Sequence, residues 1–231
     1  MQRIFAIDFS DIANSKTLRF STRFHNLPTQ KLMNILDKID TIFVKDVVNE
    51  YQKGIQPNYN SDGDMQVVKI TNLKNSYIDF SDNENITQND FDALPNEKKL
   101  IKNDIILCAT GKISLGKIDY YDYEQTSITT VDNYILRLKE DFDPLFFTYF
   151  FRSVLGYFQI ERDFTGATNQ IHLYWEQISN FQLPNLPLPH QQKIVDEIKA
   201  KIDKQSEINK QVETLRGKID EIINEVIESV G

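Results

Sequence analysis

The segment 186–198 constrains this chain most, because an extended proline stretch there becomes a long helix. Pro187 and Pro189 favour an extended entry and remove two backbone donors. No proline interrupts residues 191–229, and a helix of about 39 residues would reach about 58 Å at about 1.5 Å per residue. Since a globular domain does not need such an arm for its own core, the pattern indicates a spacer or docking element.

The apolar residues of this helix predict that it pairs with another helix. From residue 208 onward they recur at steps of 4, 3, 4, 3 and 4, which is a heptad seam. The predicted pairing residues are Ile208, Val212, Leu215, Ile219, Ile222 and Val226. Gln205 interrupts the seam at an expected apolar position and can fix the register. The alternative is a surface helix that packs on its own domain, which its length disfavours.

Length and composition predict an ordinary soluble protein. The 231 residues suffice for one domain of about 180 residues with a proper core, plus the helix. Hydrophobic residues make up 40% and charged residues 26%, which is typical of globular proteins. We expect no membrane span, because there is no apolar run of about 18 residues. The N-terminus lacks a signal pattern and the single Cys108 cannot form an internal disulfide, so a cytoplasmic location is expected.

The charge distribution leaves nucleic-acid binding open. The net charge of −8 argues against non-specific DNA binding, which depends on Lys and Arg against phosphate. Residues 69–74 and 112–117 are nevertheless locally basic. An acidic chain can still read nucleic acid through a local basic cleft or together with a basic partner.

The secondary-structure signals predict an α+β fold. We expect a mixed-sheet globular domain over residues 1–188, with an N-terminal lead-in helix capped by Thr29, and one long helix over residues 189–231. Asp143 and Pro144 precede a single aromatic helix over 145–158. The predicted strands span 41–48, 66–71, 104–110, 127–131 and 133–138.

The strand 104–110 ends in a glycine-flanked loop, Gly111 to Lys117, that is a candidate DNA contact. Gly111 and Gly116 permit a tight or left-handed backbone. We expect Lys112 and Lys117 to contact phosphate, with Thr110 and Ser114 near the bases. The alternative is a solvated hairpin turn. A phosphate-cradling P-loop is excluded, because no Ser or Thr follows the Gly-Lys pair at a helix start.

Two further segments carry candidate DNA contacts. In 69–74 an alternating strand would face Lys69, Thr71, Asn72 and Lys74 outward, and an Asn can pair bidentately with adenine; the alternative is an ordinary exposed strand face. The loop 165–170 is dense in small hydrogen-bonding groups; the alternative is a capped loop before a helix. The candidates in and around this loop are Arg162, Thr165, Thr168, Asn169, Gln170 and His172.

The sequence carries no pattern for catalysis. The three histidines are scattered and there is one cysteine, so no metal site is expected. An amino-methyltransferase would need a glycine-rich cofactor turn and an Asn/Asp-Pro-Pro-Tyr/Phe motif, and neither is present. We therefore predict no catalytic residues and no cofactor in this chain.

The order of these segments resembles a known family. The segments are 54–57, 62–74 (DGDMQVVKITNLK), 103–117 (NDIILCATGKISLGK), 164–171 (FTGATNQI), 186–194 (LPLPHQQKI) and the long helix. Together they resemble a target recognition domain with its spacer helix, from the specificity subunit of type I restriction–modification systems. The C-terminal recognition module of fused restriction–methylation enzymes is similar. The resemblance covers nearly the whole chain.

This resemblance implies a DNA-recognition role without chemistry. It implies double-stranded DNA as ligand, with the loop 165–170 near it, and a helix that docks a DNA adenine methyltransferase subunit. That subunit would use S-adenosylmethionine, and a translocase–nuclease subunit would cleave unmodified DNA. Such subunits normally carry two recognition domains and two helices, whereas this chain has one of each. It would be a half-subunit, a single-domain form that pairs as a homodimer, or a piece of a longer chain. The stretch Arg19 to Leu27 resembles the junction in fused enzymes and favours a piece.

A second interpretation comes from another class of protein. A globular head with a dimerising coiled coil can act as a protein–protein scaffold with no nucleic-acid role, and the acidic balance favours this mildly. A third, hydrolytic, interpretation lacks catalytic motifs.

Overall fold

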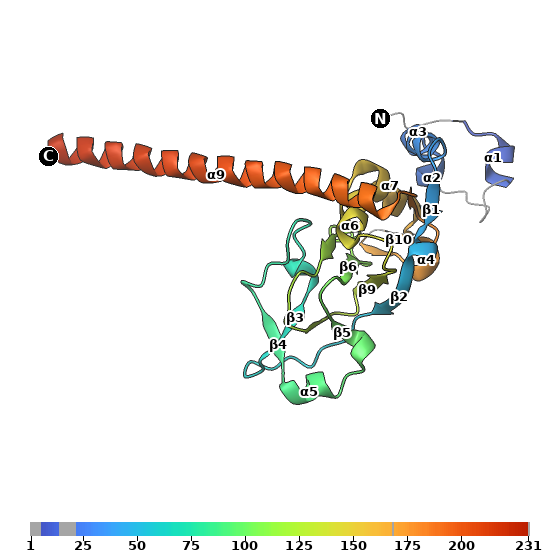
Figure 1. Cartoon of the computed structure of the whole chain (residues 1–231), viewed down its shortest axis with the longest axis horizontal. Helices are drawn as coiled ribbons and strands as arrows, with labels where there is room; N and C mark the ends of the chain where they lie inside the picture. The colour runs from blue at the N-terminus through green and yellow to red at the C-terminus, as the bar shows by residue number, and fades with distance from the viewer. Residues whose placement is uncertain (1–5, 14–21, 168, 231) are drawn as a thin grey trace. The chain divides into compact units, whose positions relative to one another are not determined.

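The computed structural model describes residues 6–13, 22–167 and 169–230, and the chain divides into two compact units, Met1–Leu188 and Pro189–Gly231. The first unit combines sheets and short helices, and the second is one long helix, α9 (Figure 1). This α+β architecture, with a mixed sheet and one long C-terminal helix, confirms the predicted fold class. Thr168 and residues 19–21 of the predicted junction lie outside the described residues.

Two four-stranded sheets form the body of the first unit within the described residues. The first has the order β2-β9-β6-β7 and is antiparallel throughout. Its strands are β2 (Val48–Lys53), β6 (Ile105–Cys108), β7 (Ile118–Tyr120) and β9 (Asn133–Leu138). The second has the order β4-β3-β8-β5 and is mixed, because β3 and β8 pair in parallel. Its strands are β3 (Met65–Val68), β4 (Glu84–Ile86), β5 (Lys99–Leu100) and β8 (Ser127–Thr129).

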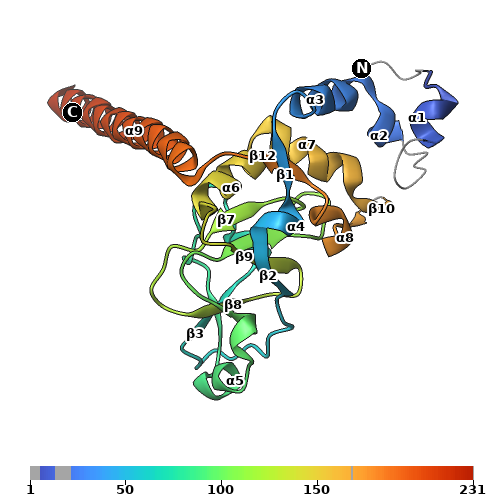
Figure 2. The ribbon, with the colours of Figure 1, turned by 45° about the vertical axis from the view of Figure 1, so that its right-hand side comes forward.

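The main core forms where the two sheets meet. One cluster of buried side chains includes Ile106 and Ile135 of the first sheet together with Val68 and Leu100 of the second. Since a strand directs alternate side chains to opposite faces, Met65 and Val67 of β3 join a second cluster with Phe91 of α5 (Gln88–Asp92). Helix α5 therefore covers part of the second sheet, at the end of the unit away from α6 and α7 (Figure 2).

The remaining elements surround these sheets. Strand β1 (Thr41–Phe43) pairs with β12 (Gln182–Pro184), and β10 (Thr165–Ala167) pairs with β11 (Gln170–His172), both antiparallel. The other helical segments of the first unit are α1 (Phe9–Ala13), α2 (Thr22–His25), α3 (Leu27–Leu36), α4 (Val44–Val47), η1 (Ile70–Asn72), η2 (Asn96–Lys98), α6 (Pro144–Arg152), α7 (Val154–Asp163) and α8 (Trp175–Ile178).

Two predicted boundaries near the N-terminus were wrong. Helix α3 is capped by Asn26, whose side chain accepts a hydrogen bond from the Thr29 backbone N–H at 2.9 Å, so Thr29 lies inside the helix. The predicted strand 41–48 is interrupted by α4. The chain changes partner there, from β12 to β9, and the first α4 amide donates to the Phe181 carbonyl at 2.9 Å. A β-branched sequence favours a strand, but this change of sheet requires a turn.

The aromatic segment forms two helices instead of the single predicted one. Ser153, at φ −70° and ψ 164°, ends α6, and its hydroxyl caps α7 by accepting from Gly156 N–H at 3.4 Å. A Cβ at Gly156 would lie 2.3 Å from the Phe150 carbonyl oxygen, so the two helices turn sharply where only glycine fits. Asp143 caps α6 and Pro144 lies in its first turn, as the sequence predicts.

The long helix α9 spans Leu188–Val230, and its 43 residues give a length of about 65 Å. It begins one residue before the predicted start at 189 and includes Pro189, which fits in a first helical turn whose N–H groups need no partner. The six predicted seam residues are between 41% and 60% exposed. Ile202, Ile223 and Ile227 add to the exposed apolar surface. None of the described helices is long and apolar enough to cross a membrane.

A buried ion pair ties α6 to β7 and predicts a stability effect. Arg152 contacts Asp119, which is fully buried and also accepts from the Asn75 backbone N–H at 3.0 Å. Replacing Arg152 by Ala leaves a buried carboxylate without its cation, so we expect the free energy of unfolding to fall by about 3–5 kcal/mol in urea denaturation. The control is Lys102→Ala, which breaks an exposed ion pair with Glu124 and should leave the urea midpoint unchanged. Equal midpoints for both variants would contradict this role of Arg152.

Candidate nucleic-acid interface

The loop that follows β6 is a compact, pinned turn. Gly111 and Gly116 adopt φ values of +84° and +80°, which permit the tight backbone that the sequence suggests. The Leu115 N–H donates to the Gly111 carbonyl at 2.8 Å, and the Gly116 N–H donates to the Cys108 carbonyl at 2.9 Å. The Leu115 side chain is buried and anchors the loop. The exposed tip therefore consists of Lys112 and Ile113.

A two-stranded ribbon, β10 and β11, is hydrogen-bonded to this loop. Gly166 has φ +93°, and a Cβ there would lie 2.0 Å from the Gln170 carbonyl oxygen, so only glycine allows the strands to approach this closely. The Gly111 N–H donates to the Ile171 carbonyl at 3.1 Å, and the Leu173 N–H donates to the Ala109 carbonyl at 2.9 Å. These bonds join the loop and the ribbon into one structural unit, named here the loop–ribbon unit (residues 109–117, 165–167 and 169–173).

The loop–ribbon unit brings together most of the predicted contacts of two separate segments. They are Thr110, Lys112, Ser114, Lys117, Thr165, Asn169, Gln170 and His172. Lys112, Asn169 and Gln170 are exposed. The Thr110 hydroxyl donates to an Asp132 carboxylate oxygen at 2.7 Å, and the Thr165 hydroxyl donates to the His172 carbonyl at 3.2 Å. The exposed amides and lysine are thus the groups best placed to reach a ligand.

Aromatic residues continue the surface beyond the ribbon, and sequence reasoning missed them. The His172 and Tyr174 rings stack with centroids 6.0 Å apart. Lys53 places its ammonium 5.5 Å from the Tyr134 ring and 5.9 Å from the Tyr174 ring. Burial raises the pKa of Tyr134. Its hydroxyl oxygen accepts a hydrogen bond from the backbone N–H of Trp175 at 3.2 Å. In the sequence, the adjacent aromatic residues Tyr174 and Trp175 directly after the loop could have indicated this surface. No local sequence feature indicated that Lys53 lies beside them.

The segment 69–74 is not the outward-facing strand that the sequence predicts. It forms η1, and Asn72 is buried; its side chain accepts from the Lys69 N–H at 2.7 Å and donates to the Asp79 carbonyl at 2.7 Å. The proposed adenine contact by Asn72 is therefore corrected, because both ends of its amide are engaged. Thr71 is exposed.

The two lysines of this segment are paired with acids. Lys69 lies 3.0 Å from Glu84, and this hydrogen bond raises the pKa of Lys69. Lys74 lies 3.5 Å from Asp79. Phosphate would have to compete with these carboxylates, which disfavours the segment as a DNA contact.

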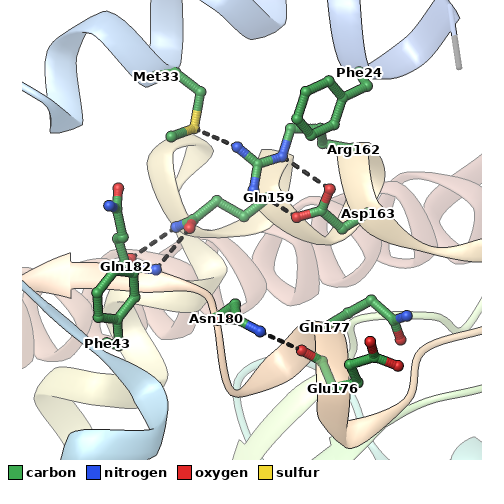
Figure 3. A pocket seen from close by; sticks show the side chains of 10 residues that line it. All are labelled: Phe24, Met33, Phe43, Gln159, Arg162, Asp163, Glu176, Gln177, Asn180 and Gln182. Atoms are coloured by element: carbon green, nitrogen blue, oxygen red, sulfur yellow. Dashed lines mark hydrogen bonds and ion pairs between the residues drawn. The ribbon is translucent and has the colours of Figure 1, made fainter. Parts of the chain in front are cut away.

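Arg162 faces a different set of elements from the loop–ribbon unit. Its Nε donates to Asp163 Oδ1 at 3.0 Å, and its guanidinium carbon lies 5.1 Å from the Phe24 ring centroid. It lines a cavity of about 260 Å³. Figure 3 shows it beside Met33 and Gln159, which line the same cavity. Because the guanidinium of Arg162 already pairs with the Asp163 carboxylate and contacts Phe24 and Met33, this side chain holds α7 against α2 and α3 in this structure.

The family model described as the type I restriction modification DNA specificity domain matches residues 37–215. The chain belongs to this family. Membership confirms the resemblance to a specificity-subunit recognition domain and the prediction of a DNA sequence-specificity module. A search of the curated proteins finds no match to the sequence of this chain.

Solved structures share the fold of this specificity domain. A chain from a study of complex assembly and conformational transition of the type I R-M system matches with TM-score 0.51 and 12% identity over 85% of this chain and 48% of its own. The HsdS subunit from Thermoanaerobacter tengcongensis matches with TM-score 0.51 and 14% identity over 76% of this chain and 43% of its own. At such identities the likeness concerns the fold. The specificity domain spans less than half the length of either chain.

The described residues of the specificity domain hold no group of three or more His, Cys, Asp or Glu side chains arranged to bind a metal ion.

The ribbon geometry predicts different effects at two glycines. Gly166→Ala adds both a positive-φ penalty and a clash with the Gln170 carbonyl, so we expect faster hydrogen exchange of the 170–172 amides. Gly111→Ala meets no atom within 4 Å and costs only backbone strain, about 1–2 kcal/mol, so its ribbon should stay protected. Hydrogen-exchange mass spectrometry separates the two, and equal protection in both would contradict the close approach at Gly166.

Proposed function

We propose that this chain is the DNA-reading half of a type I specificity subunit and that the loop–ribbon unit enters the major groove. The observation that carries this proposal is the pinning of the 111–116 loop to the β10–β11 ribbon. The major groove of B-DNA is wide enough to admit a two-stranded ribbon, and each base pair presents a distinct set of donors and acceptors there. A preformed ribbon loses little entropy on binding.

The available charges and amides support this orientation. Lys69 and Lys74 are paired with acids, whereas no ion pair involves Lys112 or Lys117 within the described part of the chain. In the proposal Lys112 and Lys117 contact phosphates and position the protein. Gln170 and Asn169 then read base edges, because their amides can donate and accept at once.

The long helix serves as the pairing and docking element in this proposal. Its seam residues lie on one heptad stripe, and leaving this stripe in water is unfavourable unless another helix covers it. The structural relatives are about twice as long as the part that this chain matches, which suits a second recognition unit with its own helix. We propose that the partner is such a helix, from a second copy or from the other half of a longer chain.

Chemistry belongs to other subunits in this proposal. The paired helices would hold a DNA adenine methyltransferase subunit, and that subunit would bind S-adenosylmethionine and modify the recognised site in the cytoplasm. One structural relative comes from a study of assembly of a type I R-M system, which supports a multi-subunit setting.

The direct test is selection of bound sequences from a random duplex pool at near-physiological salt. The chain is used together with its methyltransferase partner, so that the complete assembly is examined. Enrichment of a motif of a few base pairs, or of two such motifs at fixed spacing, would support recognition. Absence of enrichment with the partner confirmed bound would overturn the proposal and favour the scaffold function.

The loop lysines give a quantitative prediction. Lys112→Ala and Lys117→Ala should each weaken binding on specific and unrelated duplexes alike, since phosphate contacts carry no sequence information. Each should also reduce the slope of log affinity against log salt by about one. Lys38→Ala, which removes the same charge at an exposed position after α3, is the control. A salt slope unchanged in both loop variants would exclude these phosphate contacts.

The helix seam gives a second prediction. If two copies pair, the purified chain should sediment as a dimer, and Leu215→Asp should make it monomeric by placing a charge in an apolar seam. Thr214→Asp adds the same charge one residue off the seam and should leave the dimer intact. Sedimentation equilibrium measures both. A monomeric wild-type chain would restrict pairing to a different helix.

A further inference from the structure

The tip of the loop carries an apolar side chain that the predicted polar contacts leave unexplained. Ile113 is 93% exposed, which is the highest value among the large apolar side chains in the described part of the chain. Single exposed apolar residues are common on protein surfaces, so exposure alone assigns no role. The position of Ile113 on the loop–ribbon unit is what distinguishes it.

The loop does not need Ile113 for its own folding. Leu115, only 4% exposed, already supplies the apolar anchor, and a Cβ at Gly116 would meet Tyr157 and Ile160 of α7 at 3.0–3.2 Å. The Lys117 N–H donates to the Ser114 carbonyl at 3.0 Å and closes the turn. The backbone therefore holds Ile113 at a fixed place, outward, between Lys112 and Ser114.

The ribbon determines which part of DNA this side chain can reach. The Gly111 N–H donates to the Ile171 carbonyl at 3.1 Å, and Gly111 is two residues before Ile113 in the chain. If the ribbon enters the major groove, Ile113 enters the same groove. The only apolar group that a base pair presents in the major groove is the C5-methyl of thymine.

We infer that Ile113 is a specificity-determining residue that recognises thymine through its C5-methyl group. This inference rests on the proposed function, because it requires DNA in the groove that the ribbon occupies. It adds an apolar contact to a surface whose other candidate contacts are polar. The flanking Lys112, reaching toward phosphate, would hold the tip close to the base edges.

The test uses the duplex enriched in the selection experiment and replaces each thymine in turn by uracil, which removes only the methyl group. We expect one position at which the wild-type assembly loses about fourfold in affinity, the effect of one buried methyl group. Ile113→Ala should bind thymine and uracil equally at that position. The protein change Ile113→Ala and the DNA change from thymine to uracil thus form a double-mutant cycle. A non-zero coupling free energy between them would report the contact between the side chain and the methyl group.

The matched control is Ile101→Ala, the same substitution at a 45% exposed position before β6, at the opposite end of this strand from the loop. It should retain the wild-type response to uracil. Both variants should keep the wild-type unfolding midpoint, because they remove exposed side chains.

Three results would overturn the inference while leaving DNA recognition intact. One is an enriched motif without thymine on either strand, and another is an Ile113→Ala variant that still discriminates thymine from uracil. The third is a variant that weakens binding to every duplex and abolishes a DNA bend, which would show a wedge between base steps instead of methyl recognition. Failure of the selection itself would instead contradict the proposed function.

Discussion

Strand β6 is the element on which the rest of the first unit depends. Its four residues, Ile105–Cys108, are all buried, and it pairs with β7 on one side and β9 on the other. Beyond Cys108 the same chain continues to pair: the Ala109 N–H donates to the Asp132 carbonyl at 2.8 Å, and its carbonyl accepts from Leu173. The candidate interface is therefore an extension of the core strand. Its position is fixed by backbone hydrogen bonds that buried side chains protect from water.

This connection explains which parts of the site could be predicted from the sequence. Strand β9 was predicted at its observed bounds, Asn133–Leu138, because β-branched and aromatic residues end at clear turn signals. The loop 111–116 was marked by its two glycines and its lysines. Its joining to Ile171, 60 positions after Gly111, had no local signal, because pairing of distant strands is a tertiary property.

The errors have a common physical origin. Asn72 lies in a polar, alternating stretch, yet its amide is buried because the backbone of the 69–79 segment needs hydrogen-bond partners there. The break at Ser153 allows the sharp turn from α6 into α7, and the short helix α4 redirects the chain from pairing with β12 to pairing with β9. In each case local propensity favoured a regular element, and the requirement to satisfy packing and backbone hydrogen bonds elsewhere prevailed.

An acidic chain that recognises DNA must restrict where its positive charge is available. With a net charge of −8, most of the surface repels phosphate, and the lysines of the 69–74 segment are paired with Glu84 and Asp79. Lys112 and Lys117 of the loop have no ion pair within the described residues, and in the proposed function they lie close to the groups that read bases. Such an arrangement weakens non-specific binding more than specific binding, because non-specific binding depends almost entirely on phosphate contacts. In the proposed function this imbalance favours the choice of sequence over tight binding to any duplex.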